Sequence, residues 1–250
     1  MIKKITRLHK INFIKIANCV IRIIYTNKTK VVSFLNDFFV HDNKKYNYSI
    51  IFFSNKKIAF KKNPHKNFIV LPYNINVYIF QYLLRNIIQD YFEKNKNGFF
   101  LHCSGICIDN NAYLFLGPQG SGKSTIVKIL RDIALPLADD SGVIVKEENN
   151  FYFYQTPFIE KTWFKKSTKR FHINKIFFIK KAKFFKSKHL IDRNKILSLF
   201  IKQLWTDKKR LNIQVQLLMQ LIKSFNQIYE LYFPKNKEVV LSWFIKHALN

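Results

Sequence analysis

The chain has 250 residues, 48% of them hydrophobic, which is enough to bury one large core or two small ones. It carries 43 lysines and arginines against 15 acidic residues, a formal net charge of +28. Only seven of the basic residues are arginine, and lysine, asparagine, isoleucine and phenylalanine are all over-used, as in proteins from A/T-biased genomes. The charge is therefore weak evidence that the protein binds an anionic partner. We do not expect nucleic acid to be that partner.

Cysteine usage and hydropathy indicate the compartment. Cys19, Cys103 and Cys107 form no C-x-x-C pair, and so small and odd a number favours a reducing environment. No apolar run approaches the roughly 20 residues of a membrane span. Basic residues interrupt every apolar run of Met1–Lys15, so this segment lacks the core of a signal peptide. We expect a cytoplasmic protein without a membrane span.

Residues 1–98 are expected to form a β-rich extension with one amphipathic helix. Short runs of β-forming residues, separated by lysine and asparagine, predict strands at 12–24, 31–40, 48–53, 57–60 and 68–71. A helix is predicted over Asn76–Lys94, with Gly98 just beyond its end. Its apolar residues share one face: Val77, Phe80, Leu84, Ile87, Ile88 and Tyr91.

Residues 99–250 are expected to form a nucleotide-binding domain of mixed α/β structure. Two hairpins are predicted, one turning at 109–111 and one at 147–150. The strands are expected at 99–108, 112–116, 135–138, 142–146, 151–155, 175–180 and 229–233. The helices are expected at 126–133, 190–205, 207–227 and from about 236.

A glycine-rich loop is the most informative feature of this domain. All six glycines of the chain lie between Gly98 and Gly142, and three of them fall in one nonapeptide. Its residues are Gly117, Pro118, Gln119, Gly120, Ser121, Gly122, Lys123, Ser124 and Thr125. They match the phosphate-binding pattern G-x-x-x-x-G-K-[ST], and the match lies between a predicted strand and a predicted helix, as the motif requires. The alternative, a glycine turn that only joins these elements, is less favoured because motif and context agree.

Each residue type in the loop suits the binding of a nucleoside triphosphate, for which we expect ATP with Mg²⁺. Glycines let backbone amides point inward, and the helix that follows adds the partial positive charge of its N-terminus. Lys123 is expected to reach the β- and γ-phosphates, and the Ser124 hydroxyl to bind Mg²⁺.

Two adjacent aspartates and an upstream histidine are candidates for the same site. Asp139 and Asp140 follow an apolar run, 16 and 17 residues after Lys123, an interval that accommodates one helix and a return to the sheet. Adjacent side chains on a strand end point to opposite sides, so one carboxylate can hold Mg²⁺ while the other faces the acceptor as a general base. The alternative is an ordinary Asp-Asp-Ser-Gly turn. His102 lies 15 residues before Gly117 on the preceding strand, and a structural histidine is its alternative reading.

Four segments, in this order and at close spacing, resemble a known family. They are Leu101–Gly105 (LHCSG), the loop Gly117–Thr125, Leu137–Asp140 (LADD) and Tyr154–Pro157 (YQTP). Together they resemble the HPr kinase/phosphorylase family and the shorter HPr-kinase-like proteins often encoded beside peptide-modification genes. The resemblance covers about Leu101–Pro157.

This resemblance implies a P-loop nucleotide-binding core with a mixed β-sheet, the type also found in phosphoenolpyruvate carboxykinase. It implies Lys123 as phosphate ligand, Asp139 as the catalytic carboxylate with His102 close to it, and Ser124 and Asp140 as metal ligands. Two features depart from the family. Thr125 stands where HPr kinases carry an acidic residue, and no glycine follows Gly142, so their glycine-rich C-terminal signature is absent. The short HPr-kinase-like group is therefore the better match.

The leading hypothesis is a Mg²⁺- and ATP-dependent phosphotransferase that acts on a serine hydroxyl of a protein or peptide. The second is a nucleotide-binding accessory protein of a peptide-modification system, without turnover. A nucleic-acid-binding ATPase is a third, motivated by charge alone. The residues do not decide which aspartate is base and which is metal ligand, and they leave the oligomeric state open.

Overall fold

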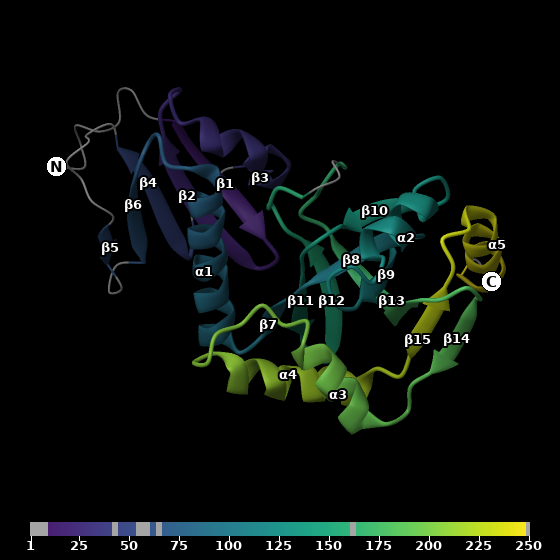
Figure 1. The fold of residues 1–250 in the computed structure, drawn as a ribbon. Coiled ribbons are helices and arrows are strands. Elements are labelled where there is room, and N and C mark those ends of the chain that lie inside the picture. Colours follow the sequence, from purple (N-terminus) through teal and green to yellow (C-terminus); the bar gives the residue numbers. More distant parts are fainter. Residues whose placement is uncertain (1–9, 42–44, 54–60, 64–66, 161–163, 249–250) are drawn as a thin grey trace. The chain divides into compact units, whose positions relative to one another are not determined.

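The computed structural model describes residues 10–41, 45–53, 61–63, 67–160 and 164–248 (Figure 1). The chain divides into two compact units. The N-terminal unit comprises Met1–Lys94 with the short segments Pro157–Ile159 and Lys166–Thr168. The C-terminal unit comprises Asn95–Thr156, Glu160–Lys165 and Lys169–Asn250. Both have a mixed sheet with helices, so the protein belongs to the mixed α/β class.

The N-terminal unit contains, in its described residues, a six-stranded sheet of order β3-β1-β2-β4-β6-β5. Its strands are β1 (Lys10–Ile16), β2 (Cys19–Tyr25), β3 (Phe39–Val40), β4 (Tyr48–Phe53), β5 (Lys61–Asn63) and β6 (Phe68–Pro72). A 3-10 helix, η2 (Lys30–Phe38), and a long helix, α1 (Val77–Asn95), accompany the sheet. Phe80 of α1 is fully buried and contacts the rings of Phe52 on β4 and Phe34 on η2. These aromatic contacts join helix and sheet in one core.

Helix α1 was expected, and the buried face holds Phe80, Leu84, Ile87 and Ile88 as the periodicity predicts. Three strand predictions were wrong. The strand expected at 99–108 is broken at His102, and its two parts pair with different strands of the C-terminal unit. Residues 12–24 form a hairpin of β1 and β2, and most of 31–40 is helical. The buried residues of η2 are Val31, Val32, Leu35 and Phe38, and their spacing is helical. Valine is β-branched and typical of strands, so the composition predicted a strand here. The strand expected at 57–60 lies outside the described residues.

The C-terminal unit contains, where the chain is described, a nine-stranded sheet. Seven strands follow the order β10-β8-β9-β13-β12-β11-β7, and β15 joins the second half of β13 and carries β14 at its edge. The strands are β7 (Gly98–Leu101), β8 (Cys103–Ile108), β9 (Asn111–Leu116), β10 (Leu135–Ala138), β11 (Gly142–Glu147), β12 (Asn150–Gln155), β13 (Arg170–Lys181), β14 (Lys186–His189) and β15 (Ile228–Phe233). β13 pairs in parallel with β9 and β15, and the other pairs of this sheet are antiparallel.

Helices cover both faces of this sheet (Figure 1). They are α2 (Lys123–Leu130), α3 (Arg193–Ile201), α4 (Leu211–Ser224) and α5 (Lys237–Ala248). Alternating side chains of β9 separate the two cores: Leu114 and Leu116 pack with residues of α3 and α4, and Phe115 packs with residues of α2 and α5. The unit therefore has three layers, with the sheet in the middle.

Register brings four strand ends to one edge of the sheet. Leu116 at the end of β9 pairs with Cys103 at the start of β8, and with Phe178 near the end of β13. Ala138 at the end of β10 pairs with Gly105 of β8. The loop after β9, the residue before β8, the residues after β10 and the last residues of β13 therefore gather at this edge.

Candidate functional site

The glycine-rich loop connects β9 to α2 at this edge. Gly120 and Gly122 have φ values of +79° and +104°, which L residues with a side chain rarely adopt. A Cβ on Gly122 would also stand 2.7 Å from Cζ of the buried Phe233 on β15. Helix α2 begins directly after Gly122, so the free amide groups of its first turn lie at the loop. This arrangement can receive an anion.

The side chain of Lys123 is folded into the loop. The residue is 6% exposed, and its Nζ donates to the carbonyl oxygens of Gly117 at 2.6 Å and Pro118 at 3.2 Å. Both acceptors are neutral, whereas a hydrogen bond from an ammonium group to an anionic oxygen is roughly twice as strong. The ammonium group is thus held where an anion in the loop would meet it.

A pocket of about 570 Å³ opens at the loop and the neighbouring strand ends. It is lined by His102, Gln119, Gly120, Gly122, Lys123, Ser124, Thr125, Asp139, Asp140, Lys181 and Trp205. The residues that the sequence singled out from three separate segments therefore line one pocket. Gly117, Pro118 and Ser121 do not line it. They line a second pocket.

Asp139 follows β10 and lines the first pocket, with both of its carboxylate oxygens shielded from solvent. The residue is 5% exposed, and neither carboxylate oxygen has a hydrogen-bond partner among the described residues. A buried carboxylate without donors is costly, by about 1–3 kcal/mol or more for each unmet group. Asp139 is therefore the group in this pocket whose oxygens most need a ligand, a proton donor or a cation.

Asp140 and His102 lie together at the same pocket. His102 Nε2 is 3.4 Å from Asp140 Oδ1, and the side chains are 33% and 48% exposed. The main chain places the histidine, because its N–H donates to the carbonyl oxygen of Gln203 at 2.8 Å. Its ring lies 6.1 Å, between centroids, from that of Trp205. Asp139 is buried and Asp140 is half-exposed, so the two carboxylates differ in environment as adjacent strand-end residues should.

The donor set of the pocket suits a hard cation. Carboxylate and hydroxyl oxygens are the ligands that Mg²⁺ prefers, together with phosphate oxygens and water, and Asp139, Asp140 and Ser124 supply them here. Within the described ranges, no three His, Cys, Asp or Glu residues are grouped as a ready-made metal site. The residues present fit an ion bound jointly with phosphate.

The second pocket has a volume of about 850 Å³ and shares His102, Gln119, Gly120 and Lys181 with the first. Its remaining lining residues are Gly117, Pro118, Ser121, Phe178, Ile179, Lys180, Leu199, Lys202 and Gln203. The lining thus combines loop backbone, apolar side chains and three lysines. Two cavities of different character therefore adjoin at one stretch of the loop.

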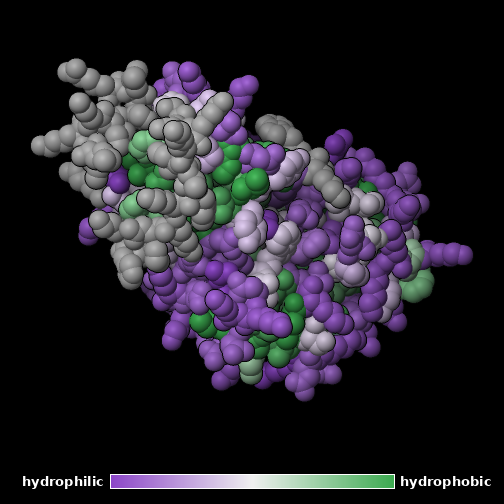
Figure 2. Space-filling view, turned by 60° about the vertical axis from the view of Figure 1, so that its left-hand side comes forward, coloured by the Kyte–Doolittle hydropathy of each residue, from purple (hydrophilic) through white to green (hydrophobic). Residues whose placement is uncertain are grey.

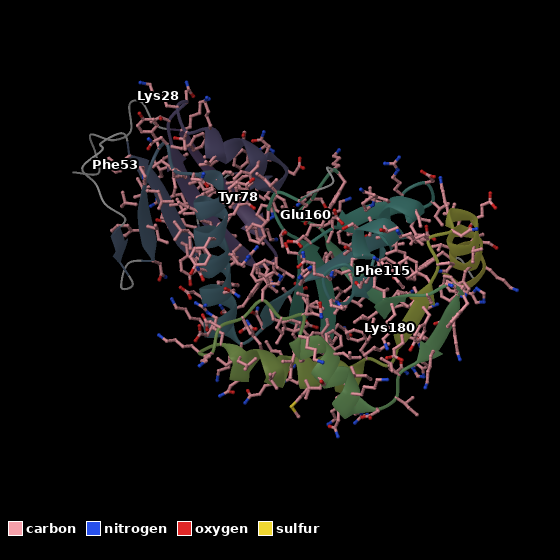
Figure 3. The ribbon with its side chains drawn as sticks, in the orientation of Figure 1. Lys28, Phe53, Tyr78, Phe115, Glu160 and Lys180 are labelled. Atoms are coloured by element: carbon pink, nitrogen blue, oxygen red, sulfur yellow. The ribbon has the colours of Figure 1, made fainter. Side chains whose placement is uncertain are left out.

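Lys180 (labelled in Figure 3) is one of two half-exposed lysines that pair with a buried carboxylate beside the second pocket. The Glu230 carboxylate on β15 is 3% exposed and accepts Lys180 Nζ at 3.0 Å, with Lys195 Nζ at 3.1 Å. Burial acts to raise the pKa of Glu230, but the hydrogen bonds and charges of the two lysines hold it below its ordinary value. The hydrogen bond to Glu230 raises the pKa of Lys180 in turn.

Three residues near the site were not predicted from the sequence. Lys181 ends β13 and lines both pockets, and Trp205 lines the first. Glu160 accepts a hydrogen bond from the backbone N–H of Asp139. The position of Lys181 at the end of a strand beside the loop strand was a usable signal, but that strand was predicted to end one residue earlier. Glu160 lies in a segment without regular structure, which offers no pattern.

The face drawn in Figure 2 is predominantly hydrophilic, with smaller hydrophobic patches. No helix in the described part of the chain is long and apolar enough to cross a membrane.

No protein-family model matches the chain. No curated protein is similar to it at a significant level. Among solved structures, the HPr(Ser) kinase/phosphatase from Coxiella burnetii is similar with a TM-score of 0.35 and 10% sequence identity, over 60% of this chain and 96% of that one. A similarity at this level does not carry a functional assignment, which has to come from the site itself.

Proposed function

We propose that this protein binds ATP with Mg²⁺ at residues 117–125 and transfers the γ-phosphate to a serine hydroxyl of a protein or peptide. The observation that carries the proposal is the pairing of opposite charges in one pocket. The Lys123 ammonium lies in an anion-receiving loop, and Asp139, which lines the same pocket, has a buried carboxylate without a hydrogen-bond donor among the described residues. A site that only binds phosphate gains nothing from such a carboxylate, because it repels the ligand.

The chemistry follows from the positions of the chain's own groups. Loop amides and Lys123 hold the phosphates in place and offset charge as it develops on the transferring group. Asp139 accepts the proton of the acceptor hydroxyl. The hydroxyl oxygen then forms its bond to the γ-phosphorus as the bond from that phosphorus to the β,γ-bridging oxygen breaks, and ADP leaves with the bond's electron pair.

Ser124 and Asp140 would hold Mg²⁺. When bound, the ion offsets phosphate charge. His102 lies beside Asp140 and restrains the orientation of that carboxylate.

The second pocket supplies a route for the acceptor. It adjoins the phosphate-binding pocket at His102 and the loop, and it offers apolar surface together with the cationic Lys181 and Lys202. A peptide segment with a serine near acidic residues suits this lining, since lysines attract carboxylates and Phe178 and Leu199 contact apolar side chains. The acceptor would therefore meet the phosphate at the boundary of the two pockets.

The test uses purified full-length protein with γ-labelled ATP, Mg²⁺ and serine peptides of acidic, basic and neutral sequence. We expect label transfer to a serine peptide, loss of transfer in Asp139→Asn, and loss of nucleotide binding in Lys123→Ala. Nucleotide binding without transfer or hydrolysis on any acceptor would instead identify a nucleotide-binding accessory protein. Absence of nucleotide binding in the wild type would overturn both functions.

A further inference from the structure

Side chains hold the backbone of Asp139 on both sides. Its N–H donates to Glu160 Oε2 at 2.6 Å, and its carbonyl oxygen accepts from Ser104 Oγ at 2.9 Å. Neither bond belongs to a strand ladder. The pairing of β10 with β8 shifts register between Pro136 and Ala138 and ends there, so the N–H of Asp139 would otherwise be a buried donor without an acceptor.

The neighbouring residues are held in the same manner. Gln155 Nε2 donates to the carbonyl oxygen of Leu137 at 3.0 Å, and the hydroxyls of Ser141 and Thr156 lie 3.1 Å apart. Ser104, Ser141, Gln155 and Thr156 are each at most 2% exposed. Buried polar side chains from two strands and the segment after β12 thus hold residues 137–141 in place through hydrogen bonds.

The side chain of Asp139 takes no part in this network. Its two oxygens have no hydrogen-bond partner in the described residues, although its backbone is held at both ends. Restraint of the main chain with a free carboxylate is what a catalytic base requires, since such a base must be aimed without being neutralised.

Glu160 (labelled in Figure 3) is the charged member of the network. A hydroxyl or amide oxygen would satisfy an N–H equally well in number. A carboxylate strengthens the bond, but the acceptor oxygen that meets the buried N–H is what fixes the backbone of Asp139.

We propose that Glu160 is a positioning residue, which acts on the phosphotransfer by fixing the backbone of Asp139. The inference rests on the proposed function, because it gives Asp139 its role. It assigns to Glu160 a part in turnover and no part in nucleotide binding. The hydrogen bond, more than the charge itself, is the means by which it acts.

Two substitutions separate the hydrogen bond from the charge. Glu160→Gln keeps an acceptor oxygen and loses the charge, whereas Glu160→Ala loses both. In the full-length protein we expect Glu160→Ala to lower kcat by roughly 10- to 100-fold, since a misplacement of about 1 Å has costs of this size. The Kd for ATP should stay within about twofold. Glu160→Gln should recover most of the lost kcat.

Glu147→Ala is the matched control. The Glu147 carboxylate is mostly buried in the same unit. It forms a salt bridge with Arg170 at 2.8 Å and accepts a hydrogen bond from the Tyr154 hydroxyl, but Glu147 lines neither pocket. This variant should lower the unfolding midpoint without changing kcat. The proposal is overturned if Glu160→Ala behaves as this control does. It is also overturned if Glu160→Gln loses as much kcat as Glu160→Ala, because the charge would then be what matters.

Hydrogen exchange of the Asp139 amide gives a readout that does not depend on turnover. Protection should fall in Glu160→Ala and persist in Glu160→Gln. If the wild type has no transfer activity, the proposed function fails while this measurement still decides whether Glu160 holds Asp139. Unchanged protection in Glu160→Ala would refute the positioning role directly.

Discussion

His102 Nε2 lies 3.4 Å from Asp140 Oδ1, and both residues line the pocket that Asp139 also lines. Two neighbouring aspartates thus have different partners: Asp140 has a histidine, and the side chain of Asp139 has no hydrogen-bond partner among the residues that the structure describes. The difference follows from strand-end geometry, which sends the two side chains to opposite sides. The proposed function uses this difference: we propose Asp139 as the base and Asp140 as the metal ligand.

The first prediction concerns metal dependence. Asp140→Asn should raise the Mg²⁺ concentration needed for half-maximal transfer by about tenfold or more, because an amide oxygen is a weaker ligand than a carboxylate. His102→Gln should raise it less, since the histidine acts only on the orientation of Asp140. A magnesium titration at saturating ATP measures both, and chelation with EDTA should abolish transfer.

Asp132→Asn is the control for this titration. Asp132 is half-exposed, pairs with Lys237 at 2.7 Å and lines neither pocket. Its magnesium curve should coincide with that of the wild type. A shift in Asp132→Asn as large as that in Asp140→Asn would point to general electrostatics instead of a ligand role.

A second prediction compares two glycines of the loop. Gly120→Ala adds only backbone strain, because no atom lies within 4 Å of the new Cβ, and should cost about 1–2 kcal/mol. Gly122→Ala adds backbone strain of the same kind and also a clash with the Phe233 ring. Overpacking of this sort typically costs a further ~1–3 kcal/mol. Denaturant unfolding of both variants measures the difference.

The double variant Gly122→Ala/Phe233→Leu identifies the cause. A smaller side chain at position 233 removes the clash but not the strain, so the destabilisation relative to Phe233→Leu alone should fall to that of Gly120→Ala. Equal costs for the two single glycine variants would show that Phe233 moves aside freely.

A third prediction concerns pH. In the folded protein the pKa of Glu230 is held below its ordinary value of about 4.5. The ionised carboxylate therefore contributes its full stabilisation at any pH above the ordinary value. This contribution should disappear as the pH falls through the folded-state pKa. The free energy of unfolding, measured by urea titration between about pH 6 and pH 3, should therefore fall more steeply in the wild type than in Glu230→Gln.

The same network gives a fourth prediction without a change of pH. Lys180→Ala leaves Glu230 with Lys195, and the loss should be about 1–2 kcal/mol. Lys180→Ala/Lys195→Ala leaves a carboxylate that is 3% exposed without a cation, and the loss should reach about 3–5 kcal/mol. Additive losses in the double-mutant cycle would contradict the sharing of one carboxylate.

Much of the fold of each unit could be predicted from local pattern. The hairpins β8–β9 and β11–β12 combine alternating side chains with polar turns, and the apolar stripe of α1 has a helical period. η2 was missed because its buried valines favour a strand. The edge strand β14, of sequence KSKH, was missed because it has no apolar side chain to bury.

The residues of the candidate site divide in the same way. Lys123 and Ser124 could be predicted as candidates because the motif that contains them is contiguous in sequence. Glu160 is not readable, since its contact with Asp139 spans 21 residues and arises in a segment without periodicity. Long-range hydrogen bonds of this kind depend on the whole fold, so they cannot be predicted from the local sequence pattern.

The last prediction tests the acceptor side of the proposal with charge reversal. Lys181 and Lys202 are exposed residues of the second pocket, so Lys181→Glu/Lys202→Glu should leave folding intact and repel an acidic peptide. Because Lys181 also lines the first pocket, Lys202→Glu alone is the cleaner arm for KM of the peptide, which should rise about tenfold at low salt.

Lys208→Glu/Lys223→Glu changes the net charge of the whole chain by the same amount at exposed positions that line neither pocket. Its KM should match the wild type for acidic and neutral peptides alike, since the acceptor responds to local charge. In Lys202→Glu, only the acidic peptide should lose affinity, and added salt should narrow the gap because screening weakens exposed charge pairs. Equal effects of the two charge reversals would place the acceptor elsewhere on this basic surface.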